Sequence, residues 1–230
     1  MNTSDPRPTA LVYVDGFNLY RQLLEHNPQL KWLDLEALAA RVLPDYRVIG
    51  VEYFTARIKP LPGKDPSAPQ RQQIYLRALA TRPSTTTFLG KFRIDTRVMP
   101  MHPTAFDADG KVIRVRVKKA EEKGSDVALA SRLLIDAMNR RADIYAVCTN
   151  DSDLVMPLEL VQQELGGAIG LLSTVPIKRA SNQLKQTRPQ WHRHITRADV
   201  AASQLPDEVR DATGVIRRPA KWSTDSEGPA

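Results

Sequence analysis

The sequence predicts an α/β protein with a mainly parallel central sheet. The apolar runs ALVYV (10–14) and DIYAVC (143–148) are continuous rather than alternating, which is typical of strands buried on both faces. Segments with apolar residues at helical spacing lie between such runs, as in a parallel α/β sheet. The 230 residues, of which 42% are hydrophobic and 26% charged, are enough to bury a core of this kind.

The first part of the chain alternates strands and helices. Residues 59–69 are rich in Pro and Gly and are therefore expected to form a loop. The expected regular elements are a strand at 10–14, helical stretches at 17–27 and 33–43, a strand at 47–56 and a helix at 70–81.

Residues 86–118 form a small β-rich insertion. Two β-rich runs, 86–99 and 111–119, are separated by PMHPTAFDADG, whose prolines and Asp-Gly pair favour a turn or loop. The segment Val112–Val117 alternates Val or Ile with Arg, so one face is apolar and the other basic. We expect one sheet strand plus an edge strand or hairpin here.

The remaining elements continue the alternation. We expect a helix at 124–140 with Ser125 as N-cap, a central strand at 143–148, a helix at 153–167 and a closing strand at 168–172. The predicted organisation is a polar N-terminal extension (1–9), one domain (10–187) and a C-terminal extension (188–230) whose last dozen residues are loose.

Composition excludes several classes of protein. No apolar run approaches the roughly 20 residues of a membrane span, and the polar N-terminus lacks a signal pattern, so we expect a cytoplasmic protein with no membrane partner. Cys148 is the one cysteine, so a His/Cys metal cluster is excluded. The net charge of +7 makes polyanions reasonable partners.

Acidic residues follow the buried strands. Asp15 comes directly after ALVYV, and Asp151 and Asp153 follow DIYAVC within TNDSDL. Because ligands bind at the carboxyl ends of parallel strands, these side chains are expected at one sheet edge. Asp126 lies in the first turn of a predicted helix. The alternative for each of them is a turn or helix cap.

Carboxylates gathered in one cleft repel one another unless a cation lies among them. Hard oxygen ligands favour Mg²⁺ or Mn²⁺, which also bind phosphate oxygens. The predicted chemistry is metal-assisted phosphodiester hydrolysis.

Three motifs carry a resemblance to a known family. The stretches ALVYVDGFNLY, EEKGSDVALASRLL and AVCTNDSDLVMPLELVQQELGGAIGLL resemble the NYN-domain family of PIN-like nucleases, in the right order over residues 11–173. The resemblance implies a Rossmann-like, three-layer α/β/α PIN fold and a ribonuclease that leaves a 5′ phosphate. It also implies that the acidic centre is formed by Asp15, Asp126, Asp151 and Asp153.

Substrate contacts are expected from four further residues. By the resemblance, Asn18 orients substrate or a ligand carboxylate, and the Thr149 hydroxyl braces Asp15. Lys123 is the expected phosphate contact because it lies three residues before Asp126, and Arg57 follows a strand end. Single-stranded RNA is the expected partner, and a homodimer is considered.

Three alternatives remain open. A PIN-like scaffold that binds RNA or protein without cleavage would lack ligands, whereas all four acids are present. A haloacid-dehalogenase-like phosphatase requires a second acid two residues after the first, where this chain has Phe17. A DNA nuclease is the third. Phe17 and Tyr20 are expected to pack in the core rather than stack on a base.

Overall fold

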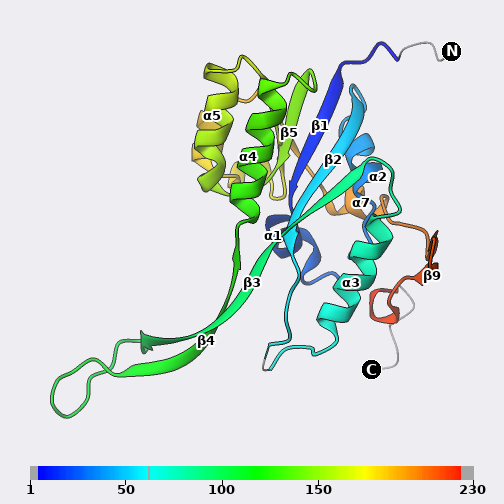
Figure 1. The fold of residues 1–230 in the computed structure, drawn as a ribbon. Helices are drawn as coiled ribbons and strands as arrows, with labels where there is room; N and C mark the ends of the chain where they lie inside the picture. Colours follow the sequence, from blue (N-terminus) through cyan, green and yellow to red (C-terminus); the bar gives the residue numbers. More distant parts are fainter. Residues whose placement is uncertain (1–4, 62, 224–230) are drawn as a thin grey trace.

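The centre of the molecule is a seven-stranded sheet in the order β4-β3-β2-β1-β5-β6-β7 (Figure 1). A computed structural model describes residues 5–61 and 63–223. All neighbouring strands run parallel except β3 and β4, which are antiparallel. The strands are β1 (Thr9–Asp15), β2 (Arg47–Ala56), β3 (Thr85–Pro100), β4 (Arg114–Lys123), β5 (Ile144–Cys148), β6 (Ala168–Ser173) and β7 (Trp191–His194). The predicted α/β class and mainly parallel sheet are confirmed, whereas the PIN-like assignment stays a prediction.

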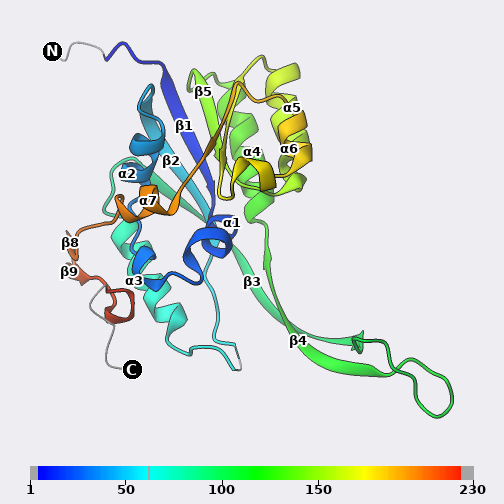
Figure 2. The same cartoon turned by 180° about the vertical axis from the view of Figure 1, so that it is seen from behind.

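Helices cover both faces of this sheet (Figures 1 and 2). One core cluster joins the sheet to α2, α3 and α7, and a second cluster joins the opposite face to α4, α5 and α6. The helices are α1 (Gly16–Leu19), α2 (Leu35–Val42), α3 (Ala68–Leu79), α4 (Ser125–Met138), α5 (Val155–Gln163), α6 (Asn182–Gln186) and α7 (Arg197–Ala201).

The continuous apolar run of β1 has a direct structural reason. Val12 and Val14 belong to one core cluster, whereas Leu11 and Tyr13 belong to the other. Successive side chains of a strand point to opposite faces. Both faces of β1 are covered by helices, so every position has to be apolar.

The first expected helix is shorter than the sequence suggested. Instead of one helix at 17–27, α1 passes into a single π-helical turn, η1 (Tyr20–Leu24), and a 3-10 turn, η2 (Pro28–Leu30), follows. Proline disfavours the helical conformation of the residue before it, and Asn27 is non-helical with φ −129° and ψ 75°. The helical path therefore stops before Pro28.

Strands β3 and β4 form a long arm. Residues 85–90 of β3 pair with β2, and from Lys91 to Pro100 β3 pairs with β4 instead. Both views show this two-stranded ribbon reaching away from the body (Figures 1 and 2). The hairpin expected in the β-rich insertion is confirmed, although it projects rather than covering the sheet.

Two helix starts differ in detail from expectation. Gly124, with a positive φ of 94°, is the N-cap of α4, and Ser125 is its first residue. Positive φ is easily adopted by glycine, which explains the choice. The segment expected as one helix at 153–167 starts with a 3-10 turn, η3 (Ser152–Leu154), before α5.

The chain beyond residue 187 is part of the folded body. Strand β7 extends the sheet past β6, which was expected to be the closing strand. The hairpin of β8 (Glu208–Asp211) and β9 (Gly214–Arg217) lies near α3, and the 3-10 turn η5 (Ala220–Trp222) brings Trp222 into a core cluster. Of the dozen terminal residues expected to be loose, residues 224–230 lie outside the described residues. In the described ranges, each helix is too short or too polar to cross a membrane.

Candidate functional site

The first candidate site lies at the carboxyl ends of β1 and β5. Asp15 is the last residue of β1 and is buried. Its Oδ1 accepts a hydrogen bond from the Asn18 backbone N–H (2.9 Å), and its Oδ2 accepts one from the Thr149 hydroxyl (3.0 Å). The bond from Thr149 is the contact that the family resemblance implied. Burial raises the pKa of Asp15, and these two hydrogen bonds act against that rise.

Asp151 caps the next helical turn. Its Oδ1 accepts a hydrogen bond from the Asp153 backbone N–H (3.0 Å), so Asp151 is the N-cap of η3. The Asp151 N–H donates to the Thr149 hydroxyl oxygen (3.0 Å). Thr149 therefore links the ends of β1 and β5. The capping role that sequence analysis weighed for these acids is present at both Asp15 and Asp151.

An acidic cleft contains some of the predicted residues. Carboxylates that line it are Asp15, Glu121, Glu122, Asp126 and Asp151, and the lining cations are Arg21, Lys119 and Lys123. Asn18 also lines this cleft, with its side-chain oxygen accepting a hydrogen bond from the Thr174 hydroxyl (2.9 Å).

Charge repulsion is visible at Asp126. Burial raises the pKa of this carboxyl to about 6, and the neighbouring carboxylates of Asp15, Glu122 and Asp151 add to the rise. Glu122, which accepts a hydrogen bond from the Ser125 N–H (2.8 Å), was not expected at the site. Its place depends on the arm strand β4 returning to the sheet, which the local sequence does not reveal.

Other predicted residues lie elsewhere or have other partners. Asp153 is exposed and does not line the acidic cleft, although its negative charge also raises the pKa of Asp126. Lys123 pairs with Glu121 (3.0 Å) rather than standing free for a phosphate. Arg57 lines a different hollow, beside α3 and the first residues of β3.

The predicted metal centre does not assemble in the described chain. Within residues 5–61 and 63–223 there is no group of three or more His, Cys, Asp or Glu side chains that could hold a metal ion. The predicted acids are thus neighbours around a cleft rather than a converged set of ligands. Binding of Mg²⁺ or Mn²⁺ stays a prediction.

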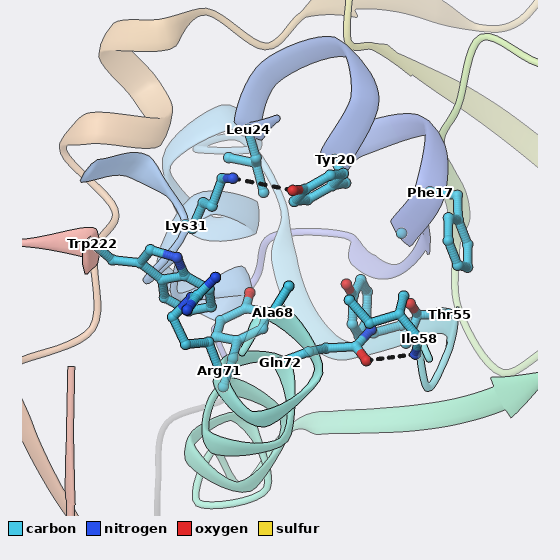
Figure 3. A pocket seen from close by; sticks show the side chains of 13 residues that line it. Phe17, Tyr20, Leu24, Lys31, Thr55, Ile58, Ala68, Arg71, Gln72 and Trp222 are labelled. Atoms are coloured by element: carbon cyan, nitrogen blue, oxygen red, sulfur yellow. Dashed lines mark hydrogen bonds between the residues drawn. The ribbon is translucent and has the colours of Figure 1, made fainter. Parts of the chain in front are cut away.

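A second hollow, the aromatic cavity, lies beside the acidic cleft. Its volume is about 150 Å³, and Phe17 lines both hollows. Aromatic side chains form much of its wall, namely Phe17, Tyr20, Tyr53, Tyr75 and Trp222. Figure 3 shows Lys31 and Arg71 among the side chains around it. These residues come from α1, η1, β2, α3 and η5, so distant parts of the chain build one cavity.

Most of this cavity was not predicted from the sequence. Phe17 and Tyr20 were expected to pack in the core, yet Tyr20 is 39% exposed and both line the cavity. Trp222 belongs to a segment that was expected to be loose. An aromatic residue in a polar, Pro-containing tail was the available signal, because Trp is rarely left in solvent without a packing partner.

Comparison with known proteins gives one named relative. No family model matches the chain. A curated protein, 6-hydroxy-3-succinoylpyridine 3-monooxygenase HspA from Pseudomonas putida (strain DSM 28022 / S16), is 28% identical over 241 residues, which cover 95% of this chain and 76% of that protein. A crystal structure of a protein of unknown function from Vibrio parahaemolyticus RIMD 2210633 covers 85% of this chain and 97% of its own, with 18% identity and a TM-score of 0.49.

The named relative corrects the functional prediction. It is a monooxygenase, so the prediction of a metal-dependent endoribonuclease, with its descriptors as a nuclease and ribonuclease, is wrong. The relative is an enzyme, which agrees with the broader expectation of an enzyme. RNA binding, a homodimer and a cytoplasmic location stay predictions.

Proposed function

We propose that this chain is an enzyme that inserts oxygen into a small aromatic compound bound in the aromatic cavity. The observation that carries the proposal is the wall of the cavity, in which five aromatic side chains surround a space of about 150 Å³. Small-molecule sites are commonly lined by apolar and aromatic side chains with a few polar groups among them. The cavity fits that description.

The position of the cavity supports the same proposal. Gly16 and Phe17 come directly after β1, and Tyr53 and Thr55 lie near the end of β2. Open α/β sheets bind ligands at the carboxyl ends of their strands. Gly16 keeps this edge compact, because a Cβ there would lie 2.6 Å from the Phe54 carbonyl oxygen.

The named relative suggests the class of reaction and substrate. Its name describes a pyridine ring with hydroxyl and succinoyl substituents, acted on by a monooxygenase. A flat ring of that kind matches aromatic walls, since rings gain from stacked or edge-to-face contacts.

The balance of the reaction defines what this chain has to do. A monooxygenase places one atom of dioxygen in the substrate and reduces the other to water. The two electrons come from a reductant such as a reduced nicotinamide or flavin, and the two protons come from that reductant and from solvent. The chain's own residues bind the ring, fix its orientation and exclude water. Burial raises the pKa of Tyr53 to about 12, so its hydroxyl stays protonated against the ring at neutral pH.

Isotope incorporation tests this function. The full chain is incubated with 6-hydroxy-3-succinoylpyridine and related hydroxypyridines under ¹⁸O₂, with NADH or NADPH and with FAD or FMN, and products are analysed by mass spectrometry. We expect a product that carries one ¹⁸O atom. Trp222→Ala should reduce turnover at least about tenfold by opening the wall, whereas Arg57→Gln, outside the cavity, should not. Binding of the substrates without ¹⁸O incorporation under every reductant would overturn the proposal.

A further inference from the structure

The aromatic cavity contains positive charge without matching negative charge. Lys31 and Arg71 line it, and none of its lining residues is an Asp or Glu. We propose that the cavity binds a small aromatic carboxylate whose ring lies against Tyr53, Tyr75 and Trp222 and whose carboxylate is held by Lys31 and Arg71. The inference names the substrate class of the proposed enzyme and rests on that function only in treating the cavity as its substrate site.

Arg71 has an unused donor. It lies in the first turn of α3, its side chain is 15% exposed, and its Nη2 donates to Asp65 Oδ2 (2.6 Å). Its Nε is buried and has no hydrogen-bond partner. A buried N–H of a charged group without a partner costs free energy. Because Arg71 lines the cavity, its guanidinium group can bind an anionic oxygen there.

Asp65 does not neutralise this region. The same carboxylate oxygen that accepts from Arg71 also accepts from Lys221, so one negative charge serves two cations. The hydrogen bond from Lys221 and the further bonds from the Ser67 N–H and Arg71 hold the pKa of Asp65 well below its usual range. Asp65 therefore stays ionised, and the group keeps a net positive charge.

Lys31 supplies the second cation. Its Nζ lies 3.1 Å from the Tyr20 hydroxyl oxygen and 4.9 Å from the centroid of the Tyr20 ring. None of the ion pairs formed by the described residues includes Lys31. Its ammonium group is thus held at the cavity by neutral contacts alone and can accept an anion.

Two neutral polar side chains of the cavity, Tyr75 and Gln72, already have protein partners. The Tyr75 hydroxyl donates to the Leu33 carbonyl oxygen (2.9 Å). Gln72 donates to the Ala56 carbonyl oxygen (2.9 Å) and accepts from the Ile58 N–H (2.9 Å), as drawn for Ile58 in Figure 3. Lys31 and Arg71 are therefore the charged groups of the cavity that can recognise an anionic ligand.

The aromatic walls of the cavity favour a ligand with an aromatic ring. Tyr53, Tyr75 and Trp222 are each at most 8% exposed, so a bound ring would be enclosed by apolar surface. Trp222 and Tyr75 meet edge to face, with centroids 6.2 Å apart. Where a bound ring and the apolar walls exclude water, the attraction between a carboxylate and the two cations is also stronger.

Calorimetric titration with matched probes tests the inference. Benzoate, benzamide and succinate are titrated into the full chain: benzamide keeps the ring without the charge, and succinate keeps the charge without the ring. We expect benzoate to bind at least about tenfold more tightly than benzamide or succinate, as a charge-assisted contact implies. Equal affinity for benzoate and benzamide, or no measurable binding of benzoate, would overturn the inference.

Substitutions of the two cavity cations test whether they hold the carboxylate of benzoate. Arg71→Gln and Lys31→Gln should each weaken benzoate about tenfold and leave benzamide unchanged. Lys111→Gln removes the same charge on the exposed arm and is the matched control. Arg71→Lys keeps the ion pair to Asp65 and should recover part of the affinity, which separates loss of binding from loss of fold. An equal effect of Lys111→Gln would contradict the assignment.

The two proposals fail in different ways. Benzoate binding with the expected variant effects, but no oxygen incorporation from ¹⁸O₂, would overturn the proposed reaction and leave the carboxylate site standing. Oxygen incorporation into neutral aromatic compounds as efficient as into carboxylates would support the reaction and overturn the carboxylate site.

Discussion

A single hydroxyl joins the two strands at the centre of the sheet. The Thr149 hydroxyl donates to the buried carboxylate of Asp15 and accepts from the Asp151 N–H. Removing it leaves a buried carboxylate oxygen and a backbone donor with one partner fewer. Such losses cost more than the average hydrogen bond, because the groups left behind stay desolvated.

We therefore predict that Thr149→Val lowers the free energy of unfolding by about 1–3 kcal/mol. Valine has nearly the same shape, so the loss reports the hydroxyl rather than a cavity. Urea unfolding followed by circular dichroism measures the change, and Thr149→Ser, which keeps the hydroxyl, is the control. A valine variant as stable as the wild type would mean that water replaces the hydroxyl.

The raised pKa of Asp126 makes the free energy of unfolding depend on pH. Its folded pKa of about 6 lies above the ordinary 3.8, so between these values the folded chain binds the proton more tightly than the unfolded chain does. Its contribution to stability therefore falls as the pH rises from about 4 to about 6 and stays low above that.

The predicted consequence is that Asp126→Asn is more stable than the wild type at pH 8 by about 1 kcal/mol, a figure reduced because the group is partly exposed to solvent. The difference should vanish near pH 4, as thermal unfolding at several pH values would measure. The untested expectation of Mg²⁺ or Mn²⁺ can be examined with the same variant: bound Mn²⁺ would stabilise the wild type and remove the advantage of Asn. An advantage of Asn that persists at pH 4 would contradict the titration.

At the scale of elements, η5 depends on one side chain. Trp222 is 8% exposed, and its ring centroid lies 6.4 Å from that of Trp32 and 6.2 Å from that of Tyr75. The turn itself has three residues, so its own hydrogen bonds contribute little. The packing of Trp222 is what holds the C-terminal segment against the cavity.

Trp222→Ala should therefore lower the free energy of unfolding by about 3 kcal/mol, as large-to-small changes in a core do. Trp222→Phe keeps an aromatic ring and should lose clearly less. Denaturant unfolding measures both, and limited proteolysis should cut the alanine variant near residues 204–223 first. If alanine and phenylalanine gave equal stability, the ring would not be what fixes this segment.

The strands of the sheet differ in how well they could be predicted from the sequence. Strands β1 and β5 were predictable because helices cover both faces and force continuous apolar runs. Strand β7, WHRH, was missed because its residues are polar and only half-buried at the edge of the sheet. An apolar sequence pattern arises where a segment is buried, and an edge strand is too little buried to have such a pattern.

The two candidate sites also differ in how far they could be predicted from the sequence. Asp15, Asp126 and Asp151 could be placed near one another because strand ends and helix starts are local features that meet at one sheet edge. The aromatic cavity could not be predicted, because Lys31, Arg71 and Trp222 come from segments up to about 190 residues apart. The motif resemblance led to a nuclease, which the named relative contradicts.

In the whole molecule, the arm formed by β3 and β4 extends from the body and is largely separate from it. Beyond Gly90 it no longer pairs with β2, and its far half exposes apolar side chains, including Val98 (54%), Met99 (40%) and Phe106 (61%). An isolated two-stranded hairpin gains little stability of its own. The body, with its helices on both sheet faces, should fold without it.

We predict that replacing residues 93–121 by an Asn-Gly turn changes the melting temperature by less than about 4 °C, or roughly 1 kcal/mol for a chain of this size. Phe92 and Glu122 are direct partners across the two strands, so a short turn can join them. Glu122 is kept because it accepts from the Ser125 N–H at the start of α4. Benzoate affinity should not change, since no residue lining the aromatic cavity is removed. Light scattering of both chains tests the homodimer prediction, because exposed apolar patches of this kind favour association. Loss of cooperative unfolding in the shortened chain would show instead that the arm is part of the folded body.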